Sequence, residues 1–130
     1  MLGTAHVLDA AAGAAIVCVT SDKCYAPGPG PHREGDPLGG RDPYSASKAA
    51  QEHVALEAFR SSGVRVIATR SFNHSGAGQA DRFVLPALVC RALALRADGG
   101  QSLPIGNTST VRDFLHVRDV ARRLALAGFH

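Results

Sequence analysis

The chain has 130 residues, of which 45% are hydrophobic and 19% are charged, a balance that is typical of one globular domain and excludes a disordered chain. Its formal net charge is +3, but the Lys and Arg residues are scattered and only 5% of the residues are aromatic. We therefore expect an anionic small ligand and no nucleic acid, which would call for a basic tail or a base-stacking surface.

The hydrophobic pattern divides the chain into helices and short strands. The strand sequences IVCVT and VRVIAT are β-branched apolar runs, which are typical of strands buried on both faces. The segments 21–43 and 70–79 contain glycines, and the first also contains many prolines, so both are predicted loops. In chain order, the pattern predicts a helix over 4–12, a strand over 16–20, a helix over 44–62, a strand over 64–69, a helix over 83–97, short extended pieces over 103–106 and 110–114, and a helix over 117–127.

This order predicts an α/β fold with a parallel sheet and flanking helices. Strands that are separated by full helices need crossover connections, and crossovers join parallel strands. Ligands bind such sheets at the carboxyl ends of the strands. Both long loops leave a strand at this end, so we expect the functional residues there.

Tyr44 and Lys48 are the strongest candidates for chemistry. Residues four apart on a helix lie on the same face, and an ammonium group next to a phenol favours the phenolate, which can act as an acid or base. Ser21, at the end of the preceding strand, can supply a hydroxyl to the same substrate oxygen. The alternative interpretation is a surface tyrosine near the start of a helix and a solvated lysine, and the spacing alone leaves both open.

The sequence around these residues resembles the extended short-chain dehydrogenase/reductase family, also called the NAD-dependent epimerase/dehydratase family. The segments 19–25 (VTSDKCY) and 34–48 (EGDPLGGRDPYSASK) are similar to the active-site region of CDP-glucose 4,6-dehydratases. The segments 70–79 (RSFNHSGAGQ) and 111–120 (VRDFLHVRDV) are similar to GDP-mannose 4,6-dehydratases and GDP-4-keto-6-deoxymannose reductases. The resemblance therefore covers nearly the whole chain and implies a Rossmann-like fold.

The resemblance implies catalytic roles for five residues. Tyr44 would remove the proton of a sugar hydroxyl, Lys48 would hold the nicotinamide ribose, and Ser21 would orient the sugar oxygen. Asp22 matches the acid that protonates the departing hydroxyl in dehydratases. Lys23 stands where many dehydratases carry a glutamate, although the CDP-glucose enzymes are similar in having lysine there. A lysine acts as a base only where its surroundings favour the neutral amine.

The resemblance also implies that Asn73 and Arg112 contact the diphosphate of a nucleotide sugar. A guanidinium group binds phosphate oxygens as a fork, and an amide supplies a neutral donor. The alternative for Arg112 is a surface ion pair with Asp113 or Asp119. Asn73 could equally be a turn residue.

NAD or NADP is the cofactor that the resemblance implies, with Tyr44, Lys48 and Ser71 as its contacts. A dinucleotide-binding fold receives the pyrophosphate at a glycine-rich turn before a helix, and the chain has no Gly-x-Gly-x-x-Gly motif. We therefore expect residues 1–130 to form a single partial domain. It would hold the catalytic half of the Rossmann-like domain and the start of the region that binds the sugar nucleotide.

The cysteines and histidines do not predict a metal site. Cys18, Cys24 and Cys90 lack metal-ligand spacing, and His74 and His116 have no second ligand at a convincing distance in sequence. The odd number of cysteines and the lack of a secretory leader lead us to expect reduced thiols in a cytoplasmic protein. No apolar stretch is long enough to cross a bilayer, so no membrane is expected as a partner.

Two hypotheses for function follow. The first is the catalytic portion of an NAD(P)-dependent 4,6-dehydratase, a lyase, or of a related epimerase or reductase, acting on a nucleotide-linked hexose. The second is an inactive, truncated remnant that serves only as a binding or dimerising module. The helices predicted over 4–12 and 44–62 match those of the family's dimer bundle, so a homodimer is expected. The isolated chain is expected not to turn over nucleotide sugars.

Overall fold

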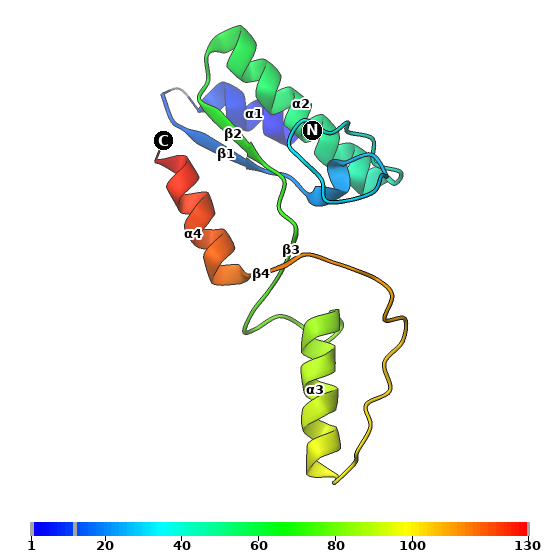
Figure 1. Cartoon of the computed structure of the whole chain (residues 1–130). Coiled ribbons are helices and arrows are strands. Elements are labelled where there is room, and N and C mark those ends of the chain that lie inside the picture. Colours follow the sequence, from blue (N-terminus) through cyan, green and yellow to red (C-terminus); the bar gives the residue numbers. More distant parts are fainter. Residues whose placement is uncertain (1, 12, 130) are drawn as a thin grey trace.

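The computed structural model describes residues 2–11 and 13–129. Helices and short strands alternate along the chain, as Figure 1 shows. The elements are α1 (Leu2–Ala10), β1 (Ile16–Val19), the 3₁₀ turn η1 (Asp22–Cys24), α2 (Pro43–Ser62), β2 (Val66–Thr69), β3 (Asn73–Ser75), α3 (Val84–Ala97), β4 (Phe114–His116) and α4 (Val117–Gly128).

The strands form two small parallel sheets. β1 pairs with β2, with Val19 opposite Thr69, so the two strands end together. β3 pairs with β4, with Asn73 opposite Phe114. In each pair a helix lies between the two strands in the chain, and the predicted parallel α/β fold is therefore confirmed.

Helices cover both faces of the β1–β2 sheet. Leu8 of α1, Cys18 of β1 and Ala55 of α2 are buried together and form the core on one face. Successive strand residues point to opposite faces, so Val17 faces away from this core. A methyl group at Gly128 of α4 would lie 3.6 Å from a side-chain carbon of Val17. The layers are therefore α1 and α2, then the sheet, then α4 (Figure 1).

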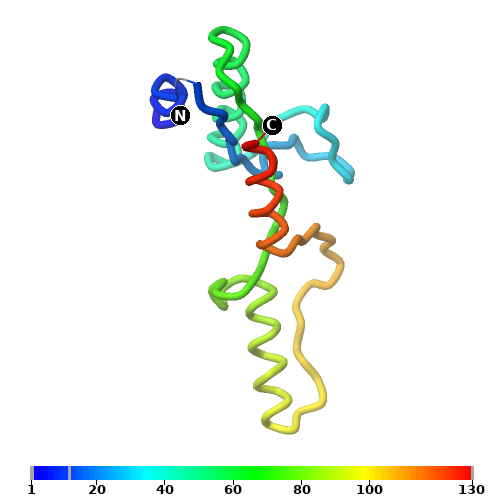
Figure 2. Tube along the Cα trace, turned by 90° about the vertical axis from the view of Figure 1, so that its left-hand side faces the viewer, coloured from blue at the N-terminus to red at the C-terminus, as the bar shows by residue number. Residues whose placement is uncertain are grey.

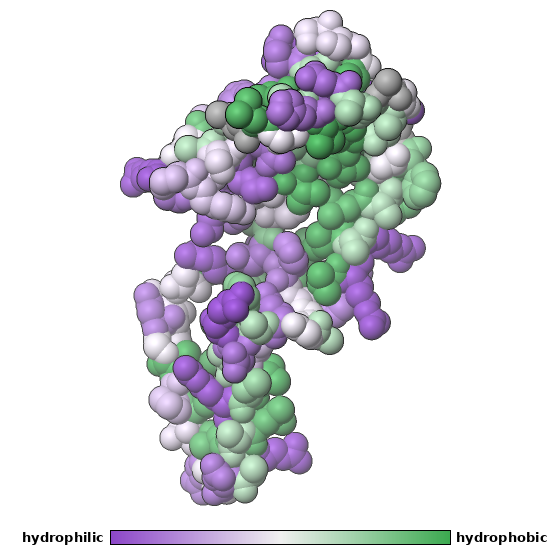
Figure 3. Space-filling view, turned by 180° about the vertical axis from the view of Figure 1, so that it is seen from behind, coloured by the Kyte–Doolittle hydropathy of each residue, from purple (hydrophilic) through white to green (hydrophobic). Residues whose placement is uncertain are grey.

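The segment from α3 to β4 projects away from this body. Figure 2 shows α3 and the chain after it running side by side as an arm. Val84, Val89 and Leu93 of α3 are exposed, and Figure 3 shows apolar side chains along this helix. No helix within residues 2–11 and 13–129 combines the length and the hydropathy needed to cross a bilayer.

Several sequence-based boundaries and environments need correction. The strands are not buried on both faces, because Val19 is 40% exposed and Ile67 is 39% exposed in a sheet of only two strands. Segment 103–106 forms no strand, and of segment 110–114 only Phe114 lies in a strand, since no neighbouring strand pairs with the rest in the described part of the chain. The predicted loop 70–79 contains β3. Ala12, the predicted end of the first helix, lies outside the described residues.

Candidate active site at the carboxyl ends of the strands

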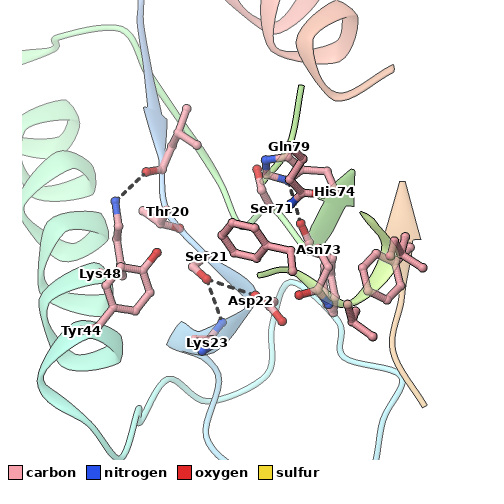
Figure 4. Close-up of a pocket in the computed structure, with 16 residues that line it drawn as sticks. Thr20, Ser21, Asp22, Lys23, Tyr44, Lys48, Ser71, Asn73, His74 and Gln79 are labelled. Atoms are coloured by element: carbon pink, nitrogen blue, oxygen red, sulfur yellow. Dashed lines mark hydrogen bonds between the residues drawn. The ribbon is translucent and has the colours of Figure 1, made fainter. Parts of the chain in front are cut away.

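A cavity of about 740 Å³ opens beside the carboxyl ends of β1 and β2 (Figure 4). This is the position at which ligands bind to parallel sheets. All the predicted site residues except Arg112 line it, namely Ser21, Asp22, Lys23, Tyr44, Lys48, Ser71 and Asn73. The segment after β1, which includes η1, the segment after β2, the start of β3 and the first turns of α2 supply these side chains.

Tyr44 and Lys48 stand one turn apart on α2. The Lys48 ammonium nitrogen lies 6.0 Å from the centroid of the Tyr44 ring. It donates to the carbonyl oxygen of Val19 at 3.3 Å and to Oε1 of Gln51 at 3.1 Å. The bond to Val19 connects the helix to the end of β1, as Figure 4 shows. The Tyr44 side chain is half-exposed, so its hydroxyl can reach a substrate in the cavity.

The start of α2 is fixed by a capping interaction. The Asp42 carboxylate accepts from the backbone N–H of Ser45 at 2.9 Å and from its hydroxyl at 2.6 Å, as expected for an N-cap residue. These hydrogen bonds, above all the one from the Ser45 hydroxyl, hold the pKa of Asp42 below its ordinary value. Pro43 occupies the first turn, where its missing N–H costs no helical bond. Tyr44 therefore projects from an ordered helix end.

Ser21 lies between the sheet and the turn that carries Asp22 and Lys23. Its side chain caps η1 by accepting from the N–H of Lys23 at 3.3 Å, and its hydroxyl donates to Oδ1 of Asp22 at 3.0 Å. Ser21 is buried, and in Figure 4 its hydroxyl, from the segment after β1, and that of Tyr44, from α2, point into the same space. The geometry thus brings a phenol, an ammonium, a hydroxyl and a carboxyl group to one cavity.

The opposite wall of the cavity combines polar and apolar groups. The side-chain amide of Asn73 donates to the carbonyl oxygen of Asp113 at 3.1 Å, which ties β3 to the segment before β4. Oε1 of Gln79 accepts from the Ser75 hydroxyl at 2.6 Å. Gln79 had not been singled out from sequence, although it belongs to a segment that the resemblance covers. The rest of this wall is largely aromatic and aliphatic: Phe72, Phe83, Val84, Leu85 and Phe114.

Sequence comparison places this geometry in a known family. The profile described as "NAD dependent epimerase/dehydratase family" matches residues 1–130. The chain belongs to this family. It is 36% identical over 132 residues to a dTDP-glucose 4,6-dehydratase from an Actinoplanes species, a match that covers 98% of the chain and 40% of that relative. It is 43% identical over 82 residues to a GDP-6-deoxy-D-mannose reductase from Pseudomonas aeruginosa, over 62% of the chain and 27% of the relative.

Solved structures of family members have the same fold. The dTDP-glucose 4,6-dehydratase of Bacillus anthracis in complex with NAD matches with a TM-score of 0.82 and 30% identity, over 98% of the chain and 42% of that structure. A structure named RMD from Pseudomonas aeruginosa, complexed with NADPH, matches with a TM-score of 0.79 and 34% identity. The predicted Rossmann-like α/β class is confirmed. The chain spans about two fifths of the length of the Actinoplanes and Bacillus anthracis enzymes.

Arg112 is the one predicted site residue of this family member that lies away from the cavity. It is exposed on the segment between α3 and β4 and donates to the carbonyl oxygen of its neighbour Val111 at 2.9 Å. Within the described part of the chain, it forms an ion pair with neither Asp113 nor Asp119. Contact between Arg112 and a diphosphate therefore stays a prediction.

His74 and His116 both take part in hydrogen bonds within the chain. Nδ1 of His74 lies 3.1 Å from the carbonyl oxygen of Phe72, and Nδ1 of His116 accepts from the N–H of Arg118 at the start of α4. Over residues 2–11 and 13–129, no three His, Cys, Asp or Glu side chains gather closely enough to hold a metal ion. Cys24, next to Lys23, is fully buried.

A buried ion pair behind the cavity had not been expected from sequence. Glu52 is 2% exposed and accepts from Nε of Arg70 at 2.9 Å, and also from Nη2 of that residue. The hydrogen bonds from Arg70 hold the pKa of Glu52 below its ordinary value, and the same bonds raise the pKa of Arg70. The sequence does hint at such a pair. Glu52 follows Lys48 by four residues and so lies on the helix face that packs against the sheet, where an unpaired carboxylate would be costly.

Proposed function

We propose that the chain carries the acid–base and substrate-binding groups of an NAD(P)-dependent enzyme that acts on a nucleotide-linked hexose, of the 4,6-dehydratase type or a related epimerase or reductase. The observation that carries this proposal is the convergence of Tyr44, Lys48 and Ser21 on one cavity at the carboxyl ends of two parallel strands. The names of the relatives, which include dehydratases and a reductase of nucleotide-linked sugars, support it.

Tyr44 is the proposed base for oxidation of the sugar. As a phenolate, it takes the proton from a ring hydroxyl while the same carbon releases a hydride, so the alcohol becomes a ketone. NAD or NADP, when bound, supplies the hydride acceptor. Ser21 donates to the reacting oxygen and holds it near Tyr44. For this, the Ser21 hydroxyl must turn away from Asp22, whose carboxylate is its partner in the free chain.

Lys48 is the proposed contact for the ribose next to the nicotinamide. An ammonium group has three N–H donors. Two donors of Lys48 are used by the carbonyl oxygen of Val19 and by Oε1 of Gln51. No acceptor within residues 2–11 and 13–129 takes the third donor, so a ribose hydroxyl can accept from it. The ammonium group of Lys48 also lies 6.0 Å from the centroid of the Tyr44 ring, which keeps a positive charge beside the proposed base. Ser71, on the same cavity wall as Asn73, is the proposed third cofactor contact.

Asp22 and Lys23 are the proposed groups for dehydration. Asp22 gives a proton to the departing hydroxyl, which leaves as water, and Lys23 removes the proton from the neighbouring carbon. Asn73 and Arg112 are proposed to bind the diphosphate. Arg112 would have to move into the cavity together with the segment between α3 and β4, which has no regular structure.

A chimaera tests the proposal, because the matched segment can replace its counterpart in the Actinoplanes dehydratase. We expect the chimaera to convert dTDP-glucose, and Tyr44→Phe to lower its turnover by a factor of about 10² to 10⁴, the usual contribution of a general base. Ser61→Ala is the control and should keep the turnover of the chimaera, because Ser61 is an exposed serine at the far end of α2. A Tyr44→Phe chimaera with unchanged turnover would remove Tyr44 from this role.

A further inference from the structure

The Glu52–Arg70 ion pair joins three parts of the chain behind the cavity. Glu52 belongs to α2, and Arg70 follows directly after β2. The third part is the loop 25–42, because Nη1 of Arg70 donates to the carbonyl oxygen of Glu34 at 2.8 Å. The guanidinium group thus connects a helix, a strand end and the loop that leads to Tyr44.

Arg70 also holds the aromatic side chain at the start of this loop. Its guanidinium carbon lies 4.7 Å from the centroid of the Tyr25 ring, within the range of a cation–π interaction. Tyr25 in turn stacks on His32, with the ring centroids 4.5 Å apart and the planes only 4° from parallel. Nδ1 of His32 lies 3.4 Å from the carboxylate of Asp36. A chain of contacts therefore runs from Glu52 to the middle of the loop.

The same carboxylate fixes the strand end that carries Ser21. The hydroxyl of Thr20 lies 3.4 Å from Oε2 of Glu52 and 3.1 Å from the carbonyl oxygen of Thr69. Thr20 directly precedes Ser21, and Glu52 lies one helical turn after Lys48. Glu52 therefore sets the distance between the end of β1 and the helix that presents Tyr44 and Lys48.

We propose that Glu52 and Arg70 are positioning residues, which hold Ser21 and the loop 25–42 in register with Tyr44 and Lys48. This inference rests on the proposed function, because the relative position of Ser21, Tyr44 and Lys48 matters only if these residues act on one substrate. An apolar pair of similar volume would stabilise a core at least as well as a buried ion pair does. The fork of Arg70, however, reaches two directions at once, to the Glu52 carboxylate and to the Glu34 carbonyl, and an apolar residue cannot do this.

The test compares Glu52→Gln and Arg70→Lys with matched exposed controls in the 130-residue chain. Glu57→Gln and Arg60→Lys are the controls, because this pair lies on the same helix, is exposed and is joined only at 3.7 Å. Hydrogen exchange is measured at loop amides that donate to backbone acceptors, namely Tyr25, Ala26 and Gly39, and at amides within α2. The near-ultraviolet circular dichroism is recorded as well, because the chain has no tryptophan and, of its two tyrosines, Tyr25 is buried and Tyr44 is half-exposed, so we expect Tyr25 to contribute most of the signal.

We expect the loop amides to exchange at least ~10-fold faster in both variants, which corresponds to about 1.4 kcal/mol of lost local stability. The tyrosine signal changes at the same time, while the amides of α2 and both control variants keep their wild-type exchange. A lysine at position 70 retains the charge that Glu52 needs, so Arg70→Lys decides the matter alone if Glu52→Gln does not fold. Unchanged loop exchange overturns the inference, and so does equal acceleration in the loop and in α2.

Binding of nucleotide sugars separates this inference from the proposed function. The exchange experiment needs no ligand, so failure of the wild-type chain to bind any of dTDP-glucose, CDP-glucose and GDP-mannose contradicts the proposed function and leaves the exchange result to decide the positioning role. If the wild-type chain binds one of them, we expect both variants to bind it more weakly than both controls. Equal affinity in variants and controls overturns the positioning role.

Discussion

The Lys48 ammonium contacts both elements that form the site, since it lies 6.0 Å from the Tyr44 ring centroid on its own helix and 3.3 Å from the Val19 carbonyl oxygen of β1. Its charge is therefore held near the phenol by the sheet. A lysine side chain loses considerable conformational entropy when it is held in one position, and the hydrogen bond to Val19 offsets part of this loss. The bond to the strand end makes this position part of the fold.

Lys48→Met is expected to weaken binding of NADH to the chimaera and to lower its turnover, because methionine keeps the apolar stem but removes the ammonium group. The affinity for NADH, measured by fluorescence titration, should fall by roughly tenfold, which equals about 1.4 kcal/mol, the strength of one charge-assisted hydrogen bond. Gln51→Met is the control for the loss of the Lys48–Gln51 bond alone. Equal NADH affinity in Lys48→Met and wild type would show that the cofactor does not contact this residue.

Gly40→Ala is expected to disturb the entry to α2. A Cβ at position 40 would clash with Cβ of Ser45 and lie 2.8 Å from the backbone carbonyl carbon of that residue, so the helix start itself would have to move. Overpacking of this kind costs roughly 1–3 kcal/mol, and thermal unfolding would measure it. Gly28→Ala is the matched control, because nothing lies within 4 Å of a Cβ there. Equal melting temperatures for the two variants would contradict the close approach at Gly40.

The three cysteines are expected to differ in reactivity. Cys18 and Cys24 are buried and Cys90 is exposed on α3. Burial is the largest influence on the Cys18 thiol and raises its pKa, so it forms less of the reactive thiolate. Mass spectrometry after brief treatment with iodoacetamide at neutral pH should therefore show one modified residue, Cys90. Equally fast labelling of Cys18 would mean that α1 and α2 do not cover the sheet as described.

The parts of the fold that could be predicted from sequence are those set by local patterns. The runs IVCVT and VRVIAT predict β1 and β2 because β-branched residues favour strands, and the four-residue spacing of Tyr44 and Lys48 places them on one helix face. β3 could not be predicted in this way. It is only three residues long, and its partner β4 pairs Phe114 with Asn73 from 41 positions away in the chain. No local periodicity reports such a pairing.

The candidate site shows the same division between local and distant contacts. Ser21, Asp22 and Lys23 follow a strand directly, so their place at the sheet edge follows from the order of elements. The contact between Arg70 and Glu52 depends on how α2 packs on the sheet, which sequence spacing does not give. Arg112 is the reverse case. The resemblance to the family implies that it binds a diphosphate, but in the structure it is exposed on an irregular segment.

The stability of the chain is expected to depend on the ionisation of Glu52 at low pH. The pKa of this carboxyl is lowered in the folded state, chiefly by its hydrogen bonds from Arg70, and the unfolded chain returns it to its ordinary value. A lowered folded-state pKa means that the unfolded state binds the proton more tightly. The contribution of Glu52 is therefore fully present above the ordinary glutamate pKa of about 4.3. It is lost as the pH falls from there through the folded-state value.

Urea unfolding of wild type and Glu52→Gln at a series of pH values isolates this contribution from that of the other carboxyl groups. The difference in unfolding free energy between the two proteins should be constant near neutral pH and shrink as the pH falls below about 4.3. Glu52→Ala, which leaves the Arg70 charge unpaired, should cost roughly 3–5 kcal/mol at pH 7. Glu57→Gln should show neither effect, because both partners of the Glu57–Arg60 pair are exposed and such pairs contribute little. A difference between wild type and Glu52→Gln that stays constant down to acid pH would mean that Glu52 is not ionised against Arg70 in the folded chain.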